Sequence, residues 1–189
     1  MRLVENPEEK IKKMEYLANF DKTTFHLIEL LAIVLGTGNY YVTNGASLYY
    51  RLATHGLERI PTDLDLVTPE FDLPQIQNEL RMQGVSSIYD SHPVSKWGLR
   101  YCEPQLRGNL NGITFDIVAK STILKSDGKK LEQHQFSSSP DWVDHHGILI
   151  PVAKLATVKE AKKFQERPHP KQDLSDLEHI EFLLKGKRG

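Results

Sequence analysis

The stretch TNGASLYYRLATHGLERIPTDLDLVTP, residues Thr43 to Pro69, decides the fold prediction. It opens with a turn of small residues, continues as a helical pattern and ends in a strand-like run. In that run Asp63 and Asp65 alternate with Leu64 and Leu66, so both carboxylates point to one face of the strand. Two carboxylates this close repel each other and are costly to bury without a cation or hydrogen-bond donors. The two aspartates are therefore either solvent-exposed residues of an edge strand or part of a cation site. An isolated Asp-x-Asp is more often the former.

Two further features favour the cation site. Asp116 lies in GITFDIVAKS, a second strand-like run that is otherwise apolar. Three acids on adjacent strands would form the oxygen-rich site that Mg²⁺ or Mn²⁺ prefers. The Asn44-Gly45 turn leads into a helix whose first turn offers Ser47, and backbone N–H groups at a helix N-terminus favour phosphate. A phosphate-binding turn beside an acidic metal site provides the two binding sites that phosphoryl or nucleotidyl transfer requires.

Hydrophobic periodicity over the whole chain predicts helices first, then a strand-helix-strand unit, a cluster of strands and two closing helices. The expected helices are one that begins near Pro7, Lys22–Val34, Ala46–Thr54, Asp72–Gly84, Pro151–Gln165 and Gln172–Leu184. The expected strands are YYVTN at 40–44, LDLVT at 64–68, VSSIYD at 85–90, WGLRYCE at 97–103, GITFDIVA at 112–119 and HGILIP at 146–151. This order predicts an α+β fold, a mixed β-sheet flanked by helices with a C-terminal helical lobe. We expect one domain over 1–189, with its core at about 20–150 and the helical lobe at about 151–186.

Composition sets broad limits on the class of protein. The chain has 189 residues, of which 39% are hydrophobic and 26% are charged, and its formal net charge is −1. That balance indicates an ordinary globular protein without a global basic field for nucleic acid, although a local basic groove is still compatible with it. Cys102 is the single cysteine, which excludes an intramolecular disulfide and is typical of a reducing compartment. The N-terminus is charged where a signal peptide needs an apolar run, and the apolar stretch Leu27 to Gly36 is too short to span a bilayer. We therefore expect a cytoplasmic protein with no membrane partner.

These motifs resemble the polymerase-β-like nucleotidyltransferases. The signature of that superfamily is a strand ending in two small residues, a helix, an acid-apolar-acid strand and a third acid on a later strand. Here the matching residues are Asn44-Gly45, Asp63-Leu64-Asp65 and Asp116. The chain is most similar to the minimal bacterial and archaeal branch that includes the toxins of AbiE-type toxin–antitoxin systems. That branch often opens with Gly-Gly-Thr-Ala-Leu followed by Arg-Leu, whereas this chain has Asn-Gly-Ala-Ser-Leu and then Arg51-Leu52, with a longer spacer before Asp63.

A second likeness lies near the C-terminus. Family members carry a helix with an inward lysine and then an Arg-Pro-Lys-Asp-x-x-Asp segment. The corresponding stretches here are LATVKEAKKF, with Lys159, and RPHPKQDLSDLEHI, with Arg167, Lys171, Asp173 and Asp176. For the last two residues a helix-capping role is favoured over a role in the site, because acids are common where a helix begins.

The resemblance implies a metal-dependent nucleotidyltransferase that transfers an NMP from an NTP to a hydroxyl group. It implies Asp63 and Asp65 as ligands of Mg²⁺ or Mn²⁺, and Asp116 as a third ligand or as the base that helps to deprotonate the acceptor. The implied phosphate contacts are Asn44, Gly45 and Ser47, with Lys159 or Arg51 as counter-charge. The acceptor is open among tRNA or other RNA, a protein side chain and a small molecule, and an antitoxin is the implied protein partner.

Two alternatives stand beside this reading. One is a nucleotide-binding or partner-binding module that keeps the fold without catalysis, and the other is a structural domain whose acids are merely exposed. Elsewhere in the chain, structural roles are favoured over functional ones: a loop or turn role for His145 and His146, a core position for Cys102 and packing for Tyr49 and Tyr50.

Overall fold

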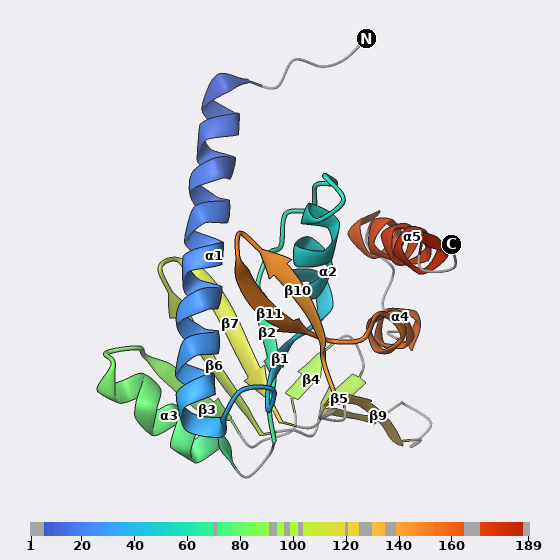
Figure 1. Ribbon diagram of the computed structural model, residues 1–189. Coiled ribbons are helices and arrows are strands. Elements are labelled where there is room, and N and C mark those ends of the chain that lie inside the picture. Colours follow the sequence, from blue (N-terminus) through green and yellow to red (C-terminus); the bar gives the residue numbers. More distant parts are fainter. Residues whose placement is uncertain are drawn as a thin grey trace.

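A seven-stranded mixed sheet forms the centre of the protein (Figure 1). The computed structural model describes residues 6–69, 72–90, 94–96, 99–101, 104–119, 121–124, 130–134, 139–164 and 171–186. The strand order of the large sheet is β10-β11-β1-β2-β7-β6-β3. Its strands are β1 (Tyr41–Val42), β2 (Leu64–Val67), β3 (Ser87–Asp90), β6 (Gln105–Leu110), β7 (Ile113–Val118), β10 (Asp141–His145) and β11 (Ile148–Val152). A separate four-stranded sheet has the order β4-β5-β8-β9, from β4 (Val94–Lys96), β5 (Leu99–Tyr101), β8 (Ser121–Leu124) and β9 (Lys130–His134).

The pairing of β2 with β7 determines where the predicted acids lie. The two strands are parallel, and Asp65 is in register with Asp116. Their neighbours Leu64, Leu66 and Phe115 are fully buried in the larger of two hydrophobic clusters. Because side chains alternate between the faces of a strand, the two carboxylates share the opposite face of the sheet.

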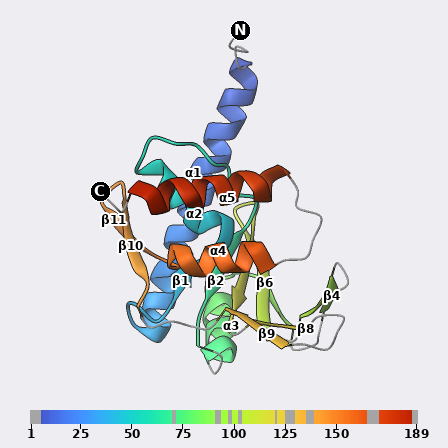
Figure 2. The same cartoon turned by 90° about the vertical axis from the view of Figure 1, so that its right-hand side faces the viewer.

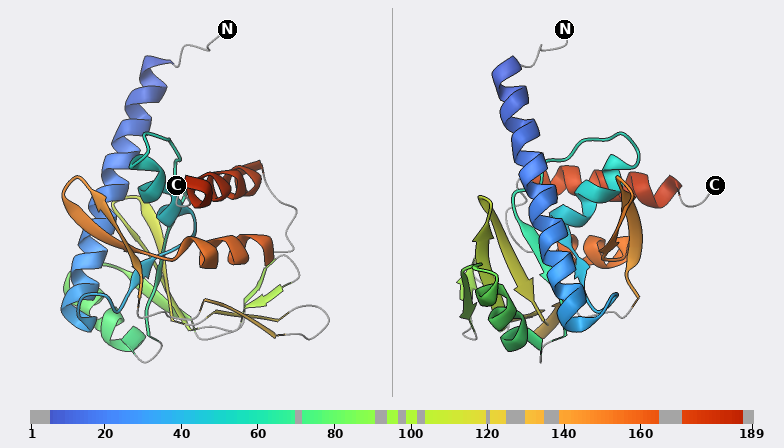
Figure 3. Two further views of the ribbon diagram at one scale, coloured as in Figure 1. Left: turned by 45° about the vertical axis from the view of Figure 1, so that its right-hand side comes forward. Right: turned by 60° about the vertical axis from the view of Figure 1, so that its left-hand side comes forward.

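Five helices are described, and they divide between the two faces of the large sheet (Figure 3). On one face, α1 (Pro7–Leu35) and α3 (Leu73–Met82) pack over the larger hydrophobic cluster. On the other face, α4 (Leu155–Phe164) and α5 (Lys171–Gly186) enclose the smaller cluster together with α2 (Asn44–Ala53), which also contributes Ala46, Tyr49 and Tyr50 to the larger cluster. Figure 2 shows α4 and α5 in front of α2 and the central strands, so the predicted C-terminal helices cover the face that carries the carboxylates.

Helix α1 is one continuous helix of 29 residues, so the expectation of two N-terminal helices is wrong. Asn6 caps it, because the Asn6 side chain accepts a hydrogen bond from the N–H of Glu8, and Pro7 occupies the first helical position. The N-terminal turns of α1 project beyond the sheet (Figure 1). None of the described helices combines the length and the apolar character needed to cross a membrane.

The α+β prediction, a mixed sheet flanked by helices, is confirmed. Several boundaries differ from the expected ones. Asn44 begins α2 instead of ending a strand, and Pro151 lies in β11, so that α4 starts at Leu155. Strands β4, β6, β8, β9 and β10 were not expected. The assignment of the whole chain to a single domain stays a prediction.

Candidate functional site

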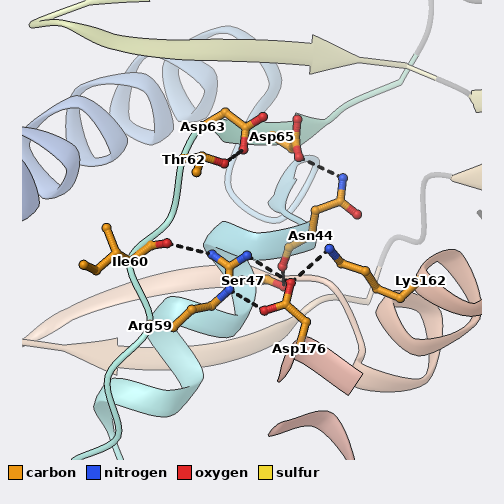
Figure 4. Close-up of polar contacts among 9 residues, drawn as sticks. All are labelled: Asn44, Ser47, Arg59, Ile60, Thr62, Asp63, Asp65, Lys162 and Asp176. Atoms are coloured by element: carbon orange, nitrogen blue, oxygen red, sulfur yellow. Dashed lines mark hydrogen bonds and ion pairs between the residues drawn. The ribbon is translucent and has the colours of Figure 1, made fainter. Parts of the chain in front are cut away.

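Three carboxylates gather at the face of β2 and β7 that α2 covers. Asp65 is partly buried in β2, and Asp116 lies beside it in β7. Asp63 is exposed immediately before β2 (Figure 4). The structure therefore brings together the three acids that the sequence nominated.

Asn44 joins this group from the start of α2. Its backbone is in the left-handed region, with φ of 50°, a conformation that asparagine adopts more readily than most residues. The Asn44 Nδ2 group donates a hydrogen bond to Asp65 Oδ2 at 2.8 Å, and the Thr43 N–H donates to the Asp65 carbonyl at 2.9 Å. Asn44 Oδ1 is buried and has no hydrogen-bond partner among the described residues. The turn is thus fixed to the acid strand and leaves one amide oxygen unsatisfied beside it (Figure 4).

The electrostatic environment of Asp65 opposes its ionisation. Burial, followed by the negative charges of Asp63 and Asp116, raises the pKa of Asp65 to about 7. The hydrogen bond from Asn44 and the charge of Lys162 act in the opposite direction but do not outweigh them. A carboxylate in this environment is stabilised by any cation that binds next to it.

We expect the metal-free protein to lose stability as the pH rises through 7. The folded-state pKa of Asp65 lies above its ordinary value of 3.8, so the folded protein holds this proton more tightly than the unfolded chain does. Raising the pH from the ordinary carboxyl range to above 7 therefore lowers the free energy of unfolding. Urea unfolding in chelator, at about pH 5 to about pH 8, measures this loss. In Asp65→Asn the loss should shrink, and an equal loss in both proteins would contradict the prediction.

The acids are not arranged as a complete metal site. Among the described residues, no group of three or more His, Cys, Asp or Glu side chains is placed to hold a metal ion. Asp116 is bound to Arg107, whose Nε and Nη2 lie 2.7 and 3.2 Å from the two carboxylate oxygens. The donors nevertheless fit a hard divalent cation, because the carboxylates of Asp63 and Asp65 and the unsatisfied Asn44 Oδ1 are all oxygen ligands.

Gly45 is required by a close approach from the loop between α2 and β2. The guanidinium group of Arg59 lies against it, and a Cβ atom at position 45 would be 2.7 Å from Arg59 Cζ. Ser47, by contrast, is fully buried, and its hydroxyl donates to the Asn44 carbonyl at 2.8 Å. In this structure Ser47 therefore stabilises the first turn of α2.

Gly45→Ala should destabilise the protein by about 1–3 kcal/mol, because the new methyl group overlaps a guanidinium that is itself held in place. In an unobstructed helix the same change would stabilise by about 0.5–1 kcal/mol. Gly186→Ala is the matched control, since nothing lies within 4 Å of a Cβ at that position of α5. Urea unfolding measures both changes. The cost of Gly45→Ala should disappear in an Arg59→Ala background, and a cost that persists there would place its cause elsewhere.

Arg59 is anchored by Asp176 of α5. The Arg59 Nε and Nη2 groups donate to the two oxygens of Asp176 at 2.7 and 3.0 Å, and Lys162 Nζ of α4 lies 3.0 Å from the same carboxylate. Burial alone would raise the pKa of Asp176, but the hydrogen bonds and charges of Arg59 and Lys162 outweigh it and hold the pKa below its ordinary value. The capping role favoured for Asp176 is wrong, because the residue lies beyond the first turn of α5 and forms this buried cluster.

The two predicted counter-charges lie elsewhere. Arg51 is in the last turn of α2, where its Nη2 binds Asp141 Oδ2 at 2.8 Å and the Ala153 carbonyl at 2.6 Å. Lys159 forms an ion pair with Glu181. The lysine that acts on Asp65 is Lys162, one turn further along α4.

Sequence reasoning missed Lys162 and Arg59, and it considered Arg107 only for a polyanion-binding surface. Lys162 belongs to the run VKEAKK, which offers several lysines and no period that selects one. Arg59 lies four residues before Asp63, in a stretch that carries only loop signals. Arg107 lies in β6, directly opposite Asp116, and recognising that strand would have found it.

The other residues that the sequence analysis singled out have structural roles, or they lie outside the residues that the structure describes. Tyr49 and Tyr50 are buried, which confirms their packing role, and both hydroxyls donate to Asp21. His145 ends β10, is buried and has its Nε2 3.1 Å from the Asp21 carboxylate, so the loop or turn role favoured for it is wrong, whereas His146 lies in the turn after β10 as expected. Arg167 and Cys102 lie outside the described residues, as do the side chains of Lys171 and Asp173.

Comparison with known proteins finds likeness in three-dimensional structure. No family model matches the chain, and no curated protein matches it. A proposed nucleotidyltransferase of Thermotoga maritima (TM1012) is 20% identical, with a TM-score of 0.54 over 93% of this chain and 94% of that one. ANT(2″)-Ia, solved in complex with adenylyl-2″-tobramycin, is 13% identical, with a TM-score of 0.55 over 88% of this chain and 90% of that one. A solution structure of ANT(2″)-Ia, described as an antibiotic-resistance factor, is also 13% identical and gives 0.52 over 87% and 85%. The chain therefore has the mixed α+β fold seen in these nucleotidyltransferase structures.

Proposed function

We propose that the protein is a metal-dependent nucleotidyltransferase that transfers an NMP from an NTP to a hydroxyl group, with pyrophosphate as the leaving group. The observation that carries the proposal is the pairing of Asp65 with Asp116, together with the hydrogen bond from Asn44 at the start of α2 to Asp65. This arrangement puts concentrated negative charge beside a helix N-terminus. The first feature suits a divalent cation and the second suits phosphate, and a nucleoside triphosphate with its metal ion requires both.

Each residue has a proposed role. Asp63 and Asp65 hold Mg²⁺ or Mn²⁺, and Asp116 is a third ligand or the base that accepts the proton of the attacking hydroxyl. When bound, the metal ion neutralises charge on the polyphosphate and favours in-line displacement. Gly45 and the N–H groups of the first turn of α2 receive the outer phosphates, while Ser47 supports that turn.

The phosphate counter-charge in this proposal is Lys162. Arg51 and Lys159 are bound to Asp141 and Glu181, respectively. Lys162 is also paired, with Asp176, but it is close enough to Asp65 to lower the pKa of that carboxyl group. Its position beside Asn44 and Asp176 (Figure 4) supports an electrostatic role toward the same phosphates.

The catalytically silent module is the second candidate, and the ion pair between Arg107 and Asp116 favours it. In that pair Asp116, the proposed base or third metal ligand, is already bound to Arg107. Because Arg107 is half-exposed, the pair is open to solvent on one side, and surface ion pairs of this kind contribute little stability. The catalytic proposal is therefore preferred, and the transfer assay distinguishes it from the catalytically silent module.

The acceptor remains open. The ANT(2″)-Ia structure contains an adenylylated antibiotic, which supports testing small-molecule hydroxyl acceptors here as well. RNA or protein acceptors and an antitoxin partner rest only on the sequence resemblance, as does a cytoplasmic location, so they stay predictions.

The deciding experiment incubates the protein with Mg²⁺ or Mn²⁺ and each NTP in turn, in the presence of total RNA, total protein or a set of hydroxyl-bearing small molecules. Each NTP is labelled either at the α-phosphate or at the γ-phosphate. Transfer of α-label alone identifies nucleotidyl transfer, while transfer of γ-label identifies phosphoryl transfer and contradicts the proposal. NTP-dependent thermal stabilisation without any transfer across all acceptor classes identifies the silent module.

A further inference from the structure

A cavity lies at the C-terminal end of α2, away from the carboxylates. Its volume is about 780 Å³, and it is lined by the end of α2, by β10 and by the last turns of α5. In Figures 2 and 3 the β10–β11 hairpin and the C-terminal end of α5 lie on the same side of the molecule. Since a helix rises about 1.5 Å per residue, Arg51 and Thr54 lie roughly 10–15 Å along α2 from Asn44. A cavity of this size is typical of small-molecule sites and is separate from the proposed nucleotide site.

Two large aromatic side chains line the cavity and remain exposed. Trp142 of β10 is 44% exposed, and Phe182 of α5 is 52% exposed. The ring of His55, at the end of α2, meets Phe182 edge to face, with centroids 6.0 Å apart. The cavity therefore offers apolar area together with aromatic faces, which attract cations.

Among the described residues that line the cavity, the carboxylates Asp141 and Asp144 outnumber the single guanidinium of Arg51. Arg51 is 7% exposed, and its Nη2 is already bound to Asp141 and to the Ala153 carbonyl. Its Nε is also buried, without a partner among the described residues, and the ion pair with Asp141 offsets the charge of the guanidinium. Asp141 is 33% exposed, and Asp144 is exposed at the same wall. Two carboxylates and one largely buried guanidinium therefore line the cavity. The partial negative charge at the C-terminal end of α2 adds to the negative charge of the carboxylates.

We propose that this cavity binds an organic cation, an amine carried on an aromatic or branched apolar body. The ammonium group pairs with Asp144 and the exposed part of Asp141, and the apolar body lies between Trp142 and Phe182. The site requires no nucleotide and no metal ion. A neutral ligand of the same shape loses the charge pairing, and an anionic one meets like charge.

Three probes that differ mainly in charge test the proposal: 2-phenylethylamine, 2-phenylethanol and 3-phenylpropionate. The chain has two tryptophans, so Trp97→Phe leaves Trp142 as the single tryptophan whose fluorescence reports on the cavity. We expect saturable quenching by the amine and about tenfold weaker binding of the alcohol, with weaker binding still of the carboxylate. Equal or tighter binding of the carboxylate overturns the proposal, and so does the absence of saturable binding by all three probes at millimolar concentration.

Variants locate the binding. Asp144→Asn keeps the side-chain oxygen that accepts from the Gly147 N–H and removes the charge, so it should weaken amine binding several-fold without affecting the alcohol. Phe182→Ala should weaken both, whereas Leu149→Ala, an exposed apolar position outside the cavity lining, is the matched control and should weaken neither. Amine binding that survives Asp144→Asn and Phe182→Ala unchanged overturns the proposal. Asp65→Asn should leave amine binding intact, so loss of nucleotide transfer and loss of this site are distinguishable.

Discussion

Asp65→Asn should abolish the proposed nucleotide transfer and, in the absence of metal, make the protein more stable. The substitution keeps the shape of the side chain and an oxygen that can accept the hydrogen bond from Asn44, but it removes the central negative charge of the site. We expect transfer to fall by about 10³-fold or more, since a bound metal ion contributes several kcal/mol to such a reaction. The same change removes a carboxyl group whose pKa is raised to about 7 and whose ionisation at about pH 8 destabilises the folded protein. In chelator at about pH 8 the melting temperature should therefore rise by about 2–6 °C.

The two effects together distinguish a functional acid from a structural one. A carboxylate that serves the fold loses stability when it becomes an amide, whereas one held against burial and repulsion for a ligand gains it. Thermal unfolding with and without Mn²⁺ and ATP, beside the transfer assay, measures both effects. Asp72→Asn is the control, because Asp72 makes no side-chain cap hydrogen bond at the start of α3. Transfer at the wild-type rate, or a ligand-induced rise in melting temperature equal to that of wild type, would refute the assigned role of Asp65.

The carboxylate face of the sheet could be predicted because strand geometry is local. A two-residue period places Asp65 on the face opposite Leu64 and Leu66, and Asp63 lies immediately before the strand. The neighbouring position of Asp116 required only that two apolar runs pair in parallel, which they do. The sequence thus contained the part of the site that depends on alternation within a strand.

The cations of the site could not be predicted, because their positions depend on tertiary packing. Lys159 and Lys162 lie on the same helix, and only its docking against α2 and α5 decides which of them approaches Asp65. Arg59 is in a loop, whose path is fixed by contacts with α1, namely the ion pair of Lys13 with Glu58 and the hydrogen bond from Tyr16 to the Pro61 carbonyl. Strand β6, QLRGNL, has too little apolar alternation to be recognised, and its pairing with β7 and β3 defines it instead.

Asp176→Asn should produce the largest loss of stability, about 3–5 kcal/mol, because it leaves two buried cations without their shared carboxylate. Arg59 and Lys162 are each 8% exposed and Asp176 is 1% exposed, so water cannot replace the lost charge. A loss of this size corresponds to a fall in melting temperature of about 6–15 °C. Glu178→Gln is the matched control, since Glu178 is exposed on the same helix and its substitution should change little.

The pH dependence of this loss identifies its cause. The pKa of Asp176 is held below its ordinary value by Arg59 and Lys162, so its contribution is complete above the ordinary carboxyl pKa and is lost as the pH falls through the lowered one. The difference in unfolding free energy between wild type and Asp176→Asn should therefore be constant near neutral pH and shrink in acid. Adding Arg59→Gln removes one of the two orphaned cations, so the double variant should be more stable than the sum of the single changes. A difference that stays constant into acid, with additive single changes, would mean that Asp176 acts through packing, and the charge cluster that links α5 to the start of α2 would lose its assigned role.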